Sequence, residues 1–166
     1  MDHQDISLLT EEGRFVHRAG AIILRDNHLL MVGNDKVPYY YTVGGRVRFG
    51  ETSAQAVVRE VWEETATRFA VERLLFVHEN FFVWELDDRP CHEVSLYYLM
   101  SPPDHWNLTC DTYGEDGRRE SLRWLPVDRL GDYQIFPRFL PMELPRMSEG
   151  VRHYITRDAQ SRPATP

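Results

Sequence analysis

Cysteine is scarce in this sequence. The 166 residues include two cysteines, Cys91 and Cys110, which are too far apart in the chain for a C-x-x-C motif. Two cysteines are too few for the disulfide framework that stabilises many small secreted domains. We therefore expect a protein of the reducing cytoplasm. A chain of this length, 42% apolar, can bury a core in one domain. We place that domain at residues 1–160 and predict a disordered tail at 161–166.

Long apolar runs and positive charge are also in short supply. No segment approaches the ~18 apolar residues of a membrane-spanning helix, and polar residues at 2–5 interrupt any N-terminal signal peptide. The formal net charge is −7 and the basic residues are scattered, so a nucleic acid polymer would meet net repulsion. We predict neither a membrane nor a nucleic acid polymer as partner. A small phosphate ester remains compatible, because divalent cations in an acidic pocket reverse the local field.

Apolar and β-branched runs predict most of the strands. We expect strands at 15–24, 28–32, 39–43, 71–84, 93–100 and 121–125. The first two, joined across Asp26-Asn27, predict a β-hairpin, and residues 87–90 (DDRP) predict a turn. Gly44-Gly45 indicates a tight turn or a close backbone approach. Residues 126–130 favour a short helix, whereas the three prolines in 135–147 favour broken helical turns.

One segment is strongly helical and begins near Thr52. Thr52 and Gln55 have the spacing of a capping box. At ~100° per residue, we expect an apolar arc and an acidic arc. The apolar arc contains Ala54, Val57, Val58, Val61, Trp62 and Thr65, and the acidic arc contains Ser53, Ala56, Glu60, Glu63 and Glu64.

Three carboxylates, of Glu60, Glu63 and Glu64, are expected to share the acidic arc. Like charges at this spacing cost a few tenths of a kcal/mol per pair. One interpretation is a solvated acidic face on which Arg59 pairs with Glu63. The other is a site for a hard cation, because Mg²⁺ prefers oxygen ligands and commonly takes carboxylates together with substrate phosphate oxygens.

The frame around these acids is Gly45, then Glu51, then Arg59-Glu60-Val61-Trp62-Glu63-Glu64. It resembles the box of the Nudix hydrolase family, G-x5-E-x7-R-E-U-x-E-E-x-G-U, where U is aliphatic. Ala66 and Thr67 depart from the pattern, which has Gly and an aliphatic residue there. Ala66 implies a different exit from the helix, or a cost of ~1 kcal/mol if φ must be positive. A looser resemblance extends from residues 18–23 (RAGAII) to 92–94 and 123–126.

The resemblance implies an α/β fold, an α/β/α sandwich with a mixed β-sheet, in which the box forms a loop–helix–loop catalytic motif. It also implies hydrolysis of a phosphoanhydride (pyrophosphate) bond in a nucleoside diphosphate linked to another moiety. The implied cofactor is Mg²⁺, with Mn²⁺ as a possible substitute. Its implied ligands are Glu60, Glu63, Glu64 and the carbonyl of Gly44. Glu51 would brace this cluster or bind a second metal, and Arg59 would orient a glutamate.

The general base and the substrate contacts are expected both within the box and beyond it. The base is open among Glu93, Glu115, Glu120 and a box glutamate. Arg46 and Arg48 lie two apart, so in an extended segment they share one face, where they clamp phosphates or form a solvated strand edge. Among the aromatic residues, we select Tyr39 and Tyr41 for the substrate, because alternation along a strand turns about half of them inward. His78 and His92 lack a second nitrogen ligand and are interpreted as structural or rim residues.

Two other interpretations stay open. A Nudix-fold module could bind a nucleotide or a partner protein and regulate it without catalysis, although such modules usually lose box acids and this chain keeps them. The acidic helix could also be a solubilising face of an unrelated domain. The resemblance makes a homodimer possible, and the 101–119 loop with residues 39–41 is where substrate specificity is expected.

Overall fold

The computed structural model describes residues 4–34, 38–84, 88–104, 112–113 and 119–158. The strands are β1 (Ser7–Leu9), β2 (Arg14–Arg25), β3 (His28–Asn34), β4 (Tyr39–Thr42), β5 (Gly44–Arg46), β6 (Ala70–Trp84), β7 (Arg89–Ser101), β8 (Thr112–Tyr113), β9 (Arg119–Pro126), β10 (Gln134–Phe136) and β11 (Arg152–Arg157). The helices are α1 (Ser53–Thr65) and α2 (Leu140–Glu143), with 3₁₀ turns η1 (Val127–Asp132) and η2 (Leu144–Arg146). The predicted tail, Glu115 and Cys110 lie outside the described residues.

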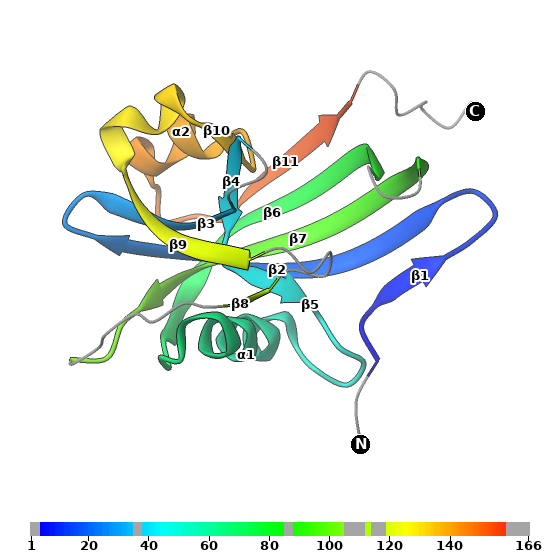
Figure 1. Cartoon of the computed structure of the whole chain (residues 1–166), viewed down its shortest axis with the longest axis horizontal. Coiled ribbons are helices and arrows are strands. Elements are labelled where there is room, and N and C mark those ends of the chain that lie inside the picture. The colour runs from blue at the N-terminus through cyan, green and yellow to red at the C-terminus, as the bar shows by residue number, and fades with distance from the viewer. Residues whose placement is uncertain (1–3, 35–37, 85–87, 105–111, 114–118, 159–166) are drawn as a thin grey trace.

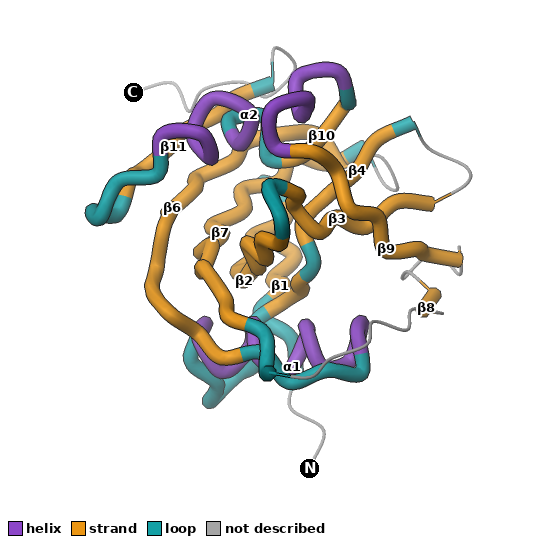
Figure 2. Tube along the Cα trace, turned by 90° about the vertical axis from the view of Figure 1, so that its left-hand side faces the viewer, coloured by secondary structure: helices purple, strands orange, loops and turns teal. Residues whose placement is uncertain are grey.

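The strands form one mixed, curled sheet with helices on both sides (Figures 1 and 2). Its order is β10-β4-β3-β2-β7-β6-β11, with β1, β5, β8 and β9 pairing beside this path. Strand β2 is parallel to β7 and antiparallel to β3 and β5. Helix α1 lies on one side of the sheet, and α2 lies on the other with the two 3₁₀ turns (Figure 1). The predicted α/β architecture with a mixed sheet is confirmed.

Strand β2 supplies side chains to both hydrophobic cores. Ala21 and Ile23 join the core under α1, whereas Ile22 joins the core under α2. All three are fully buried. Because successive side chains of a strand point to opposite faces, a strand covered on both faces is continuously apolar. The apolar run 19–24 is therefore the sequence signature of the central strand.

The predicted hairpin is confirmed. Leu24 pairs with Leu29 in antiparallel register, and the two turn residues have positive φ, 48° at Asp26 and 59° at Asn27. Positive φ at both central positions is the type I′ geometry that matches strand twist. The other predicted strands are present as β4, β6, β7 and β9, with boundaries that shift by a few residues.

Several predictions are corrected in detail. Strand β7 begins at Arg89, so Arg89 and Pro90 belong to a strand rather than to the predicted turn, and Asp88 alone remains in it among the described residues. The short helix is a 3₁₀ turn, Val127–Asp132. The 135–147 segment contains the predicted broken helical turns but also strand β10, parallel to β4. Strand β11, absent from the prediction, pairs parallel with β6.

The short strands and the edge strand β11 were not predicted because they form through tertiary pairing. Strands β1, β5 and β10 have three residues each, too few for a period to be visible. Strand β11 exposes every second residue and carries charges at its ends, as edge strands do. Across the described ranges, no helix is long and apolar enough to span a membrane.

Candidate active site

Helix α1 begins as predicted. Thr52 is the N-cap, its hydroxyl accepts from the Gln55 backbone N–H at 3.2 Å, and the Gln55 side chain accepts from the Thr52 N–H at 2.9 Å. This reciprocal capping box satisfies two donors that a helix start leaves unpaired. It fixes where the helix starts and hence where its carboxylates lie.

The predicted division into an apolar and an acidic arc holds for most residues and is wrong at Ala56 and Trp62. Ala56, assigned to the acidic arc, is fully buried, whereas Trp62, assigned to the apolar arc, is 48% exposed. At about 100° per residue, Glu60 and Glu64 fall between Ala56 and Val57, in the middle of the buried arc. Glu63 falls outside that arc and is half-exposed. The three acids therefore do not share one solvated face.

The helix exit is left-handed. Ala66 has φ 53° and ψ 20°, and its N–H donates to the carbonyl of Trp62 at 2.9 Å. This is the conformation that glycine adopts at helix C-termini. The expected different exit is thus wrong: the backbone keeps the left-handed turn and Ala66 carries the strain of about 1 kcal/mol. Thr67, the second departure, is buried and bonded to Thr65 through its N–H at 3.2 Å.

Two glycines bring the backbone up to the helix. A Cβ on Gly44, whose φ is 138°, would lie 2.3 Å from the carbonyl oxygen of Ala19. A Cβ on Gly45 would lie 2.4 Å from the carboxyl carbon of Glu60. The predicted close backbone approach is confirmed, and the space that Gly45 leaves is occupied by the Glu60 carboxylate.

Glu64 and Glu60 are carboxylates in a largely buried setting. The Gly44 N–H donates to Glu64 Oε1 at 3.0 Å. Burial nevertheless raises the pKa of Glu64 to about 8, with further increases from the charges of Glu60 and Glu120. Burial also raises the pKa of Glu60, despite the opposing effect of Arg59. Both shifts indicate that the local positive charge is too small for two ionised carboxylates.

Arg59 holds the remaining box acids. It binds Glu51 bidentately, through Nε at 2.8 Å and Nη2 at 2.9 Å. Nη1 donates to Glu60 at 2.5 Å and Glu63 at 3.2 Å, and Nη2 also donates to the Arg46 carbonyl at 3.0 Å. All five guanidinium N–H groups can thus be used. Hydrogen bonds from Arg59 are the main reason that the pKa of Glu51 is lowered.

Arg46 and Arg48 share one partner. Their guanidinium groups lie 3.8 Å and 3.6 Å from the carboxylate of Asp5. Arg48 also lies 3.8 Å from Glu63, and its backbone N–H donates to Glu51 at 3.0 Å. The shared face expected from their spacing is present, but it faces acids of the protein itself.

The three tyrosines of β4 alternate as expected. Tyr41 donates its hydroxyl proton to the Glu120 carboxylate, and Tyr39 packs near Tyr41 with ring centroids 6.5 Å apart. Tyr40 points the other way and packs edge-on against Tyr133 at 5.9 Å. Burial and the bond to Glu120 raise the pKa of Tyr41. Tyr39 and Tyr41 therefore lie on the Glu120 side of the strand.

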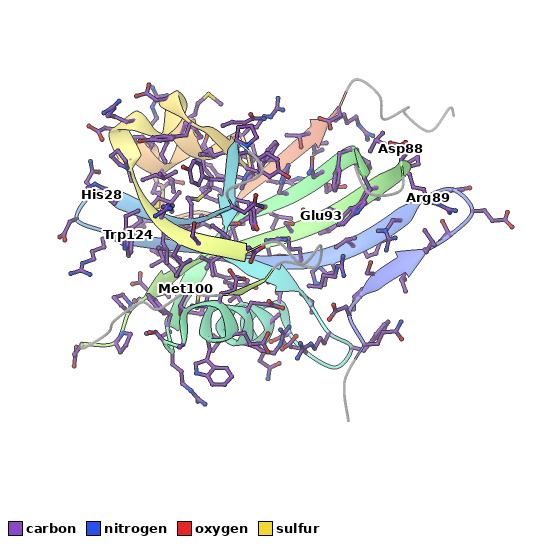
Figure 3. All side chains as sticks on the ribbon, viewed as in Figure 1. His28, Asp88, Arg89, Glu93, Met100 and Trp124 are labelled. Carbon is purple, nitrogen blue, oxygen red and sulfur yellow. The ribbon has the colours of Figure 1, made fainter. Side chains whose placement is uncertain are left out.

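Two of the general-base candidates come from strands that flank the box. Glu93 lies on β7, at the centre of the sheet (Figure 3), where Ser95 Oγ donates to it at 2.8 Å. Glu120 lies on β9, and its charge contributes to the raised pKa of Glu64. Glu115 lies outside the described residues. Glu120, 56 residues after Glu64 in the chain, therefore acts on Glu64 through its charge, whereas the charge of Glu93 acts on Arg18.

Arg18 is the site residue that sequence reasoning missed. Its Nη2 donates to the carbonyl of Gly44 at 2.9 Å and that of Thr42 at 3.3 Å. Burial lowers the pKa of Arg18, but the charges of Glu93, Glu64 and Glu60 raise it overall. One signal was present in the sequence: a charged residue in the middle of the apolar run 15–24. Charges inside a core strand are expensive and often functional.

The donor set fits a hard divalent cation in its chemistry. Glu60 and Glu64 offer carboxylate oxygens, burial raises the pKa of both, and Gly45 leaves room for one of them. In the part of the chain that the structure describes, no three His, Cys, Asp or Glu side chains already form a ligand set. Arg59 engages Glu60 and Glu63, so a cation would compete with Arg59. The Gly44 carbonyl accepts from Arg18, and its oxygen has a second lone pair for a cation.

The two histidines have structural surroundings, as predicted. His78 is 3% exposed, and its Nε2 lies 2.8 Å from the Thr156 hydroxyl. Burial lowers its pKa to about 4, so it is neutral at pH 7. His92 stacks on Phe81 with ring centroids 4.2 Å apart.

Comparison with known proteins identifies related sequences. The family model described as the NUDIX domain matches residues 15–142. A MutT-like protein of Streptomyces ambofaciens is 36% identical over 62 residues, which are 37% of this chain and 40% of that protein. This chain thus matches about two fifths of the relative's length.

Solved structures share the fold. The solution structure of the E. coli ORF135 protein superposes with a TM-score of 0.53 at 25% identity, over 76% of this chain and 84% of that chain. The crystal structure of the MutT protein from Methanosarcina mazei Go1 gives a TM-score of 0.60 at 16% identity, over 79% of this chain and 91% of that chain. The mixed sheet and its helices are therefore a shared architecture.

Proposed function

Because this chain belongs to the NUDIX domain family and so is a hydrolase acting on acid anhydrides, we propose that it cleaves a nucleoside diphosphate linked to a second group. The bond broken is the phosphoanhydride between the two phosphates. Water supplies the incoming oxygen, and two phosphate-containing products leave. We also propose that residues 1–160 act as one cytoplasmic domain on this small molecule, as the acidic net charge of −7 favours.

The observation that carries the proposal is the pair of carboxylates beside Gly44-Gly45. Glu64 accepts from the Gly44 N–H, and Glu60 occupies the space above Gly45. Two anions placed this close without sufficient positive charge are unfavourable unless a ligand supplies the charge. A solubilising acidic face would leave both groups in water and would not raise the pKa of either.

We propose that Mg²⁺, or Mn²⁺ in its place, is held by Glu60, Glu63, Glu64 and the Gly44 carbonyl. When bound, such an ion neutralises charge on phosphate oxygens and lowers the pKa of a coordinated water. The family generally uses divalent metals. Arg59 keeps Glu51, Glu60 and Glu63 oriented, which reduces the reorganisation needed when the ligand arrives.

The strands on the far side of the site supply the remaining groups. Glu93 and Glu120 are the described candidates for the general base, and each is fixed by a hydroxyl donor, from Ser95 and Tyr41 respectively. A hydroxyl that donates to a carboxylate orients the carboxylate, as proton acceptance from water requires. Tyr39 and Tyr41 are proposed to contact the base or sugar, and Arg46 and Arg48 the outer phosphate.

A substrate panel tests this function. Dinucleoside polyphosphates, ADP-ribose, nucleotide sugars and nucleoside triphosphates are each incubated with the protein and Mg²⁺ or Mn²⁺, and products are separated by ion-exchange chromatography. We expect turnover of at least one nucleoside diphosphate derivative and none by Glu64→Gln under the same conditions. A matched control is Glu11→Gln, an exposed acid outside the site.

The second candidate is a regulatory module that binds a nucleotide without cleaving it. The retention of Glu60, Glu63 and Glu64 argues against it, because a silent module has no need of the metal ligands. Tight nucleotide binding by the parent protein without turnover of any panel member would establish the module and refute the hydrolase. Size-exclusion chromatography in the same buffer tests the possible homodimer.

A further inference from the structure

Arg18 is held in place from one side only. Strand β2 presents it next to β5, where Ala19 pairs with Gly45 and Gly20 with Gly44. One guanidinium nitrogen, Nη2, reaches two carbonyl oxygens, of Gly44 at 2.9 Å and Thr42 at 3.3 Å. These contacts fix the plane of the guanidinium, because a planar group held at one nitrogen by two acceptors loses most of its freedom.

The rest of this guanidinium has nothing to bind within the described residues. Nε and Nη1 make no hydrogen bond to the chain there, no carboxylate forms an ion pair with Arg18, and neither nitrogen is fully buried. Three N–H donors of a partly buried cation are thus left open. Glu93, Glu60 and Glu64 act on Arg18 through their charge without contacting it.

The other arginines around the box are already engaged. Arg59 uses its donors on Glu51, Glu60, Glu63 and a carbonyl. Arg46 and Arg48 both face Asp5, and Arg48 also faces Glu63. An incoming phosphate would have to displace a carboxylate from each of them. At Arg18 it would displace no carboxylate of the described residues, so the reorganisation cost of binding is lowest there.

We propose that Arg18 is a substrate-binding residue that donates from Nη1 to a phosphate oxygen of the substrate, while its Nη2 anchors it to the Thr42 and Gly44 carbonyls. The inference rests on the proposed function, because it takes a diphosphate as the ligand. Arg18 and Glu64 contact the same residue, because Arg18 donates to the Gly44 carbonyl and Glu64 accepts from the Gly44 N–H. The phosphate is therefore received next to the carboxylates that are proposed to hold the metal.

The test measures binding of imidodiphosphate, a diphosphate with a nitrogen bridge, by calorimetry at saturating Mn²⁺. Arg18→Gln removes the cation and its forked donors. Because a charge-assisted hydrogen bond contributes about 1.5–3 kcal/mol, the dissociation constant should rise about 10- to 100-fold. Arg25→Gln is the matched control: it lies on the same strand and is exposed, and it should bind imidodiphosphate as the parent does.

A second measurement separates substrate binding from support of the metal site. Mn²⁺ is titrated alone, without the diphosphate. A phosphate-binding Arg18 predicts that Arg18→Gln binds Mn²⁺ as tightly as the parent or more tightly, because removal of a positive charge near Glu60 and Glu64 favours a cation. If Mn²⁺ affinity falls in parallel with imidodiphosphate affinity, Arg18 merely positions Gly44 and the proposal is wrong.

Arg18→Lys covers the case in which Arg18→Gln does not fold, as judged by far-ultraviolet circular dichroism and thermal melting. Lysine keeps the charge but cannot hold two carbonyls and a phosphate at once, so we expect a loss of about 5-fold in imidodiphosphate affinity with unchanged Mn²⁺ binding. If the Arg18 variant binds imidodiphosphate as tightly as Arg25→Gln does, the proposal is wrong. It is also wrong if the parent protein does not bind imidodiphosphate. Arg18-dependent binding without turnover of any panel substrate would refute the hydrolase and leave Arg18 as a diphosphate ligand.

Discussion

The box carries two sets of acids with opposite shifts in pKa. Around Arg59, Glu51 and Glu63 have a cation within 3.2 Å, and hydrogen bonds from it lower the pKa of Glu51. Around Gly44, Glu64 has one backbone donor, and burial raises its pKa to about 8. Glu60 lies between the two sets and contacts Arg59. The first set has a cation in direct contact, whereas among the described residues no cation contacts Glu64, and the proposed metal site rests on this difference.

The largest expected effect comes from the set that lacks charge. Glu64→Gln removes a proposed metal ligand, and we expect turnover to fall by at least ~10²-fold, because charge stabilisation in the transition state is lost. The free energy of unfolding should not fall, since the neutral amide still accepts from Gly44 and no longer places a charge in a buried site. Steady-state kinetics and urea unfolding measure the two effects. Turnover equal to that of the parent would rule out the role of Glu64.

In the set around Arg59, a substitution should lower the free energy of unfolding. Arg59→Gln leaves Glu51 and Glu60, each less than one fifth exposed, without their cation. We expect a loss of about 2 kcal/mol in the free energy of unfolding, below the range for fully buried pairs because water partly screens these groups. Combining it with Glu51→Gln should recover part of the loss. Additive losses in the double variant would show that the pair is not coupled.

A buried histidine, His78, extends the comparison to the other face of the sheet. The pKa of His78 is about 4 in the folded protein and near 6.5 when unfolded, so between these values the unfolded state binds more protons. The stability due to neutral His78 is therefore complete above pH 6.5 and is lost as pH falls toward 4, by at most about 1.4 kcal/mol per pH unit. Urea midpoints at pH 7 and 5 should differ more in the parent than in His78→Gln. Equal differences would contradict the assignment.

The smallest effect concerns the helix exit, away from either set of acids. Ala66 has φ 53°, a conformation that a glycine adopts without strain. Ala66→Gly should therefore raise the free energy of unfolding by about 1 kcal/mol and leave turnover as it is. A thermal melt that is unchanged or lower would show that the surrounding contacts already relieve the strain.

The elements that the sequence predicts well are those set by local rules. The hairpin follows from a polar pair between apolar runs, and the helix start follows from Thr52 and Gln55. The spacing of box residues predicts the family, which the match over residues 15–142 confirms. The wheel of α1 misplaced Ala56 and Trp62 because it sorted residues by polarity, and it could not show that the space left by Gly45 holds the Glu60 carboxylate inside the buried arc.

The sequence by itself determined the central strand, the box helix and the type of chemistry, because periodicity, capping and motif spacing act over a few residues. Only the tertiary structure decided that Glu60 and Glu64 point inward while Glu63 points toward Arg59, and that Arg18 reaches Gly44 from another strand. Residues far apart in the chain meet through strand pairing and through the space left by absent side chains. Neither of these leaves a period or a motif that can be read along a single chain.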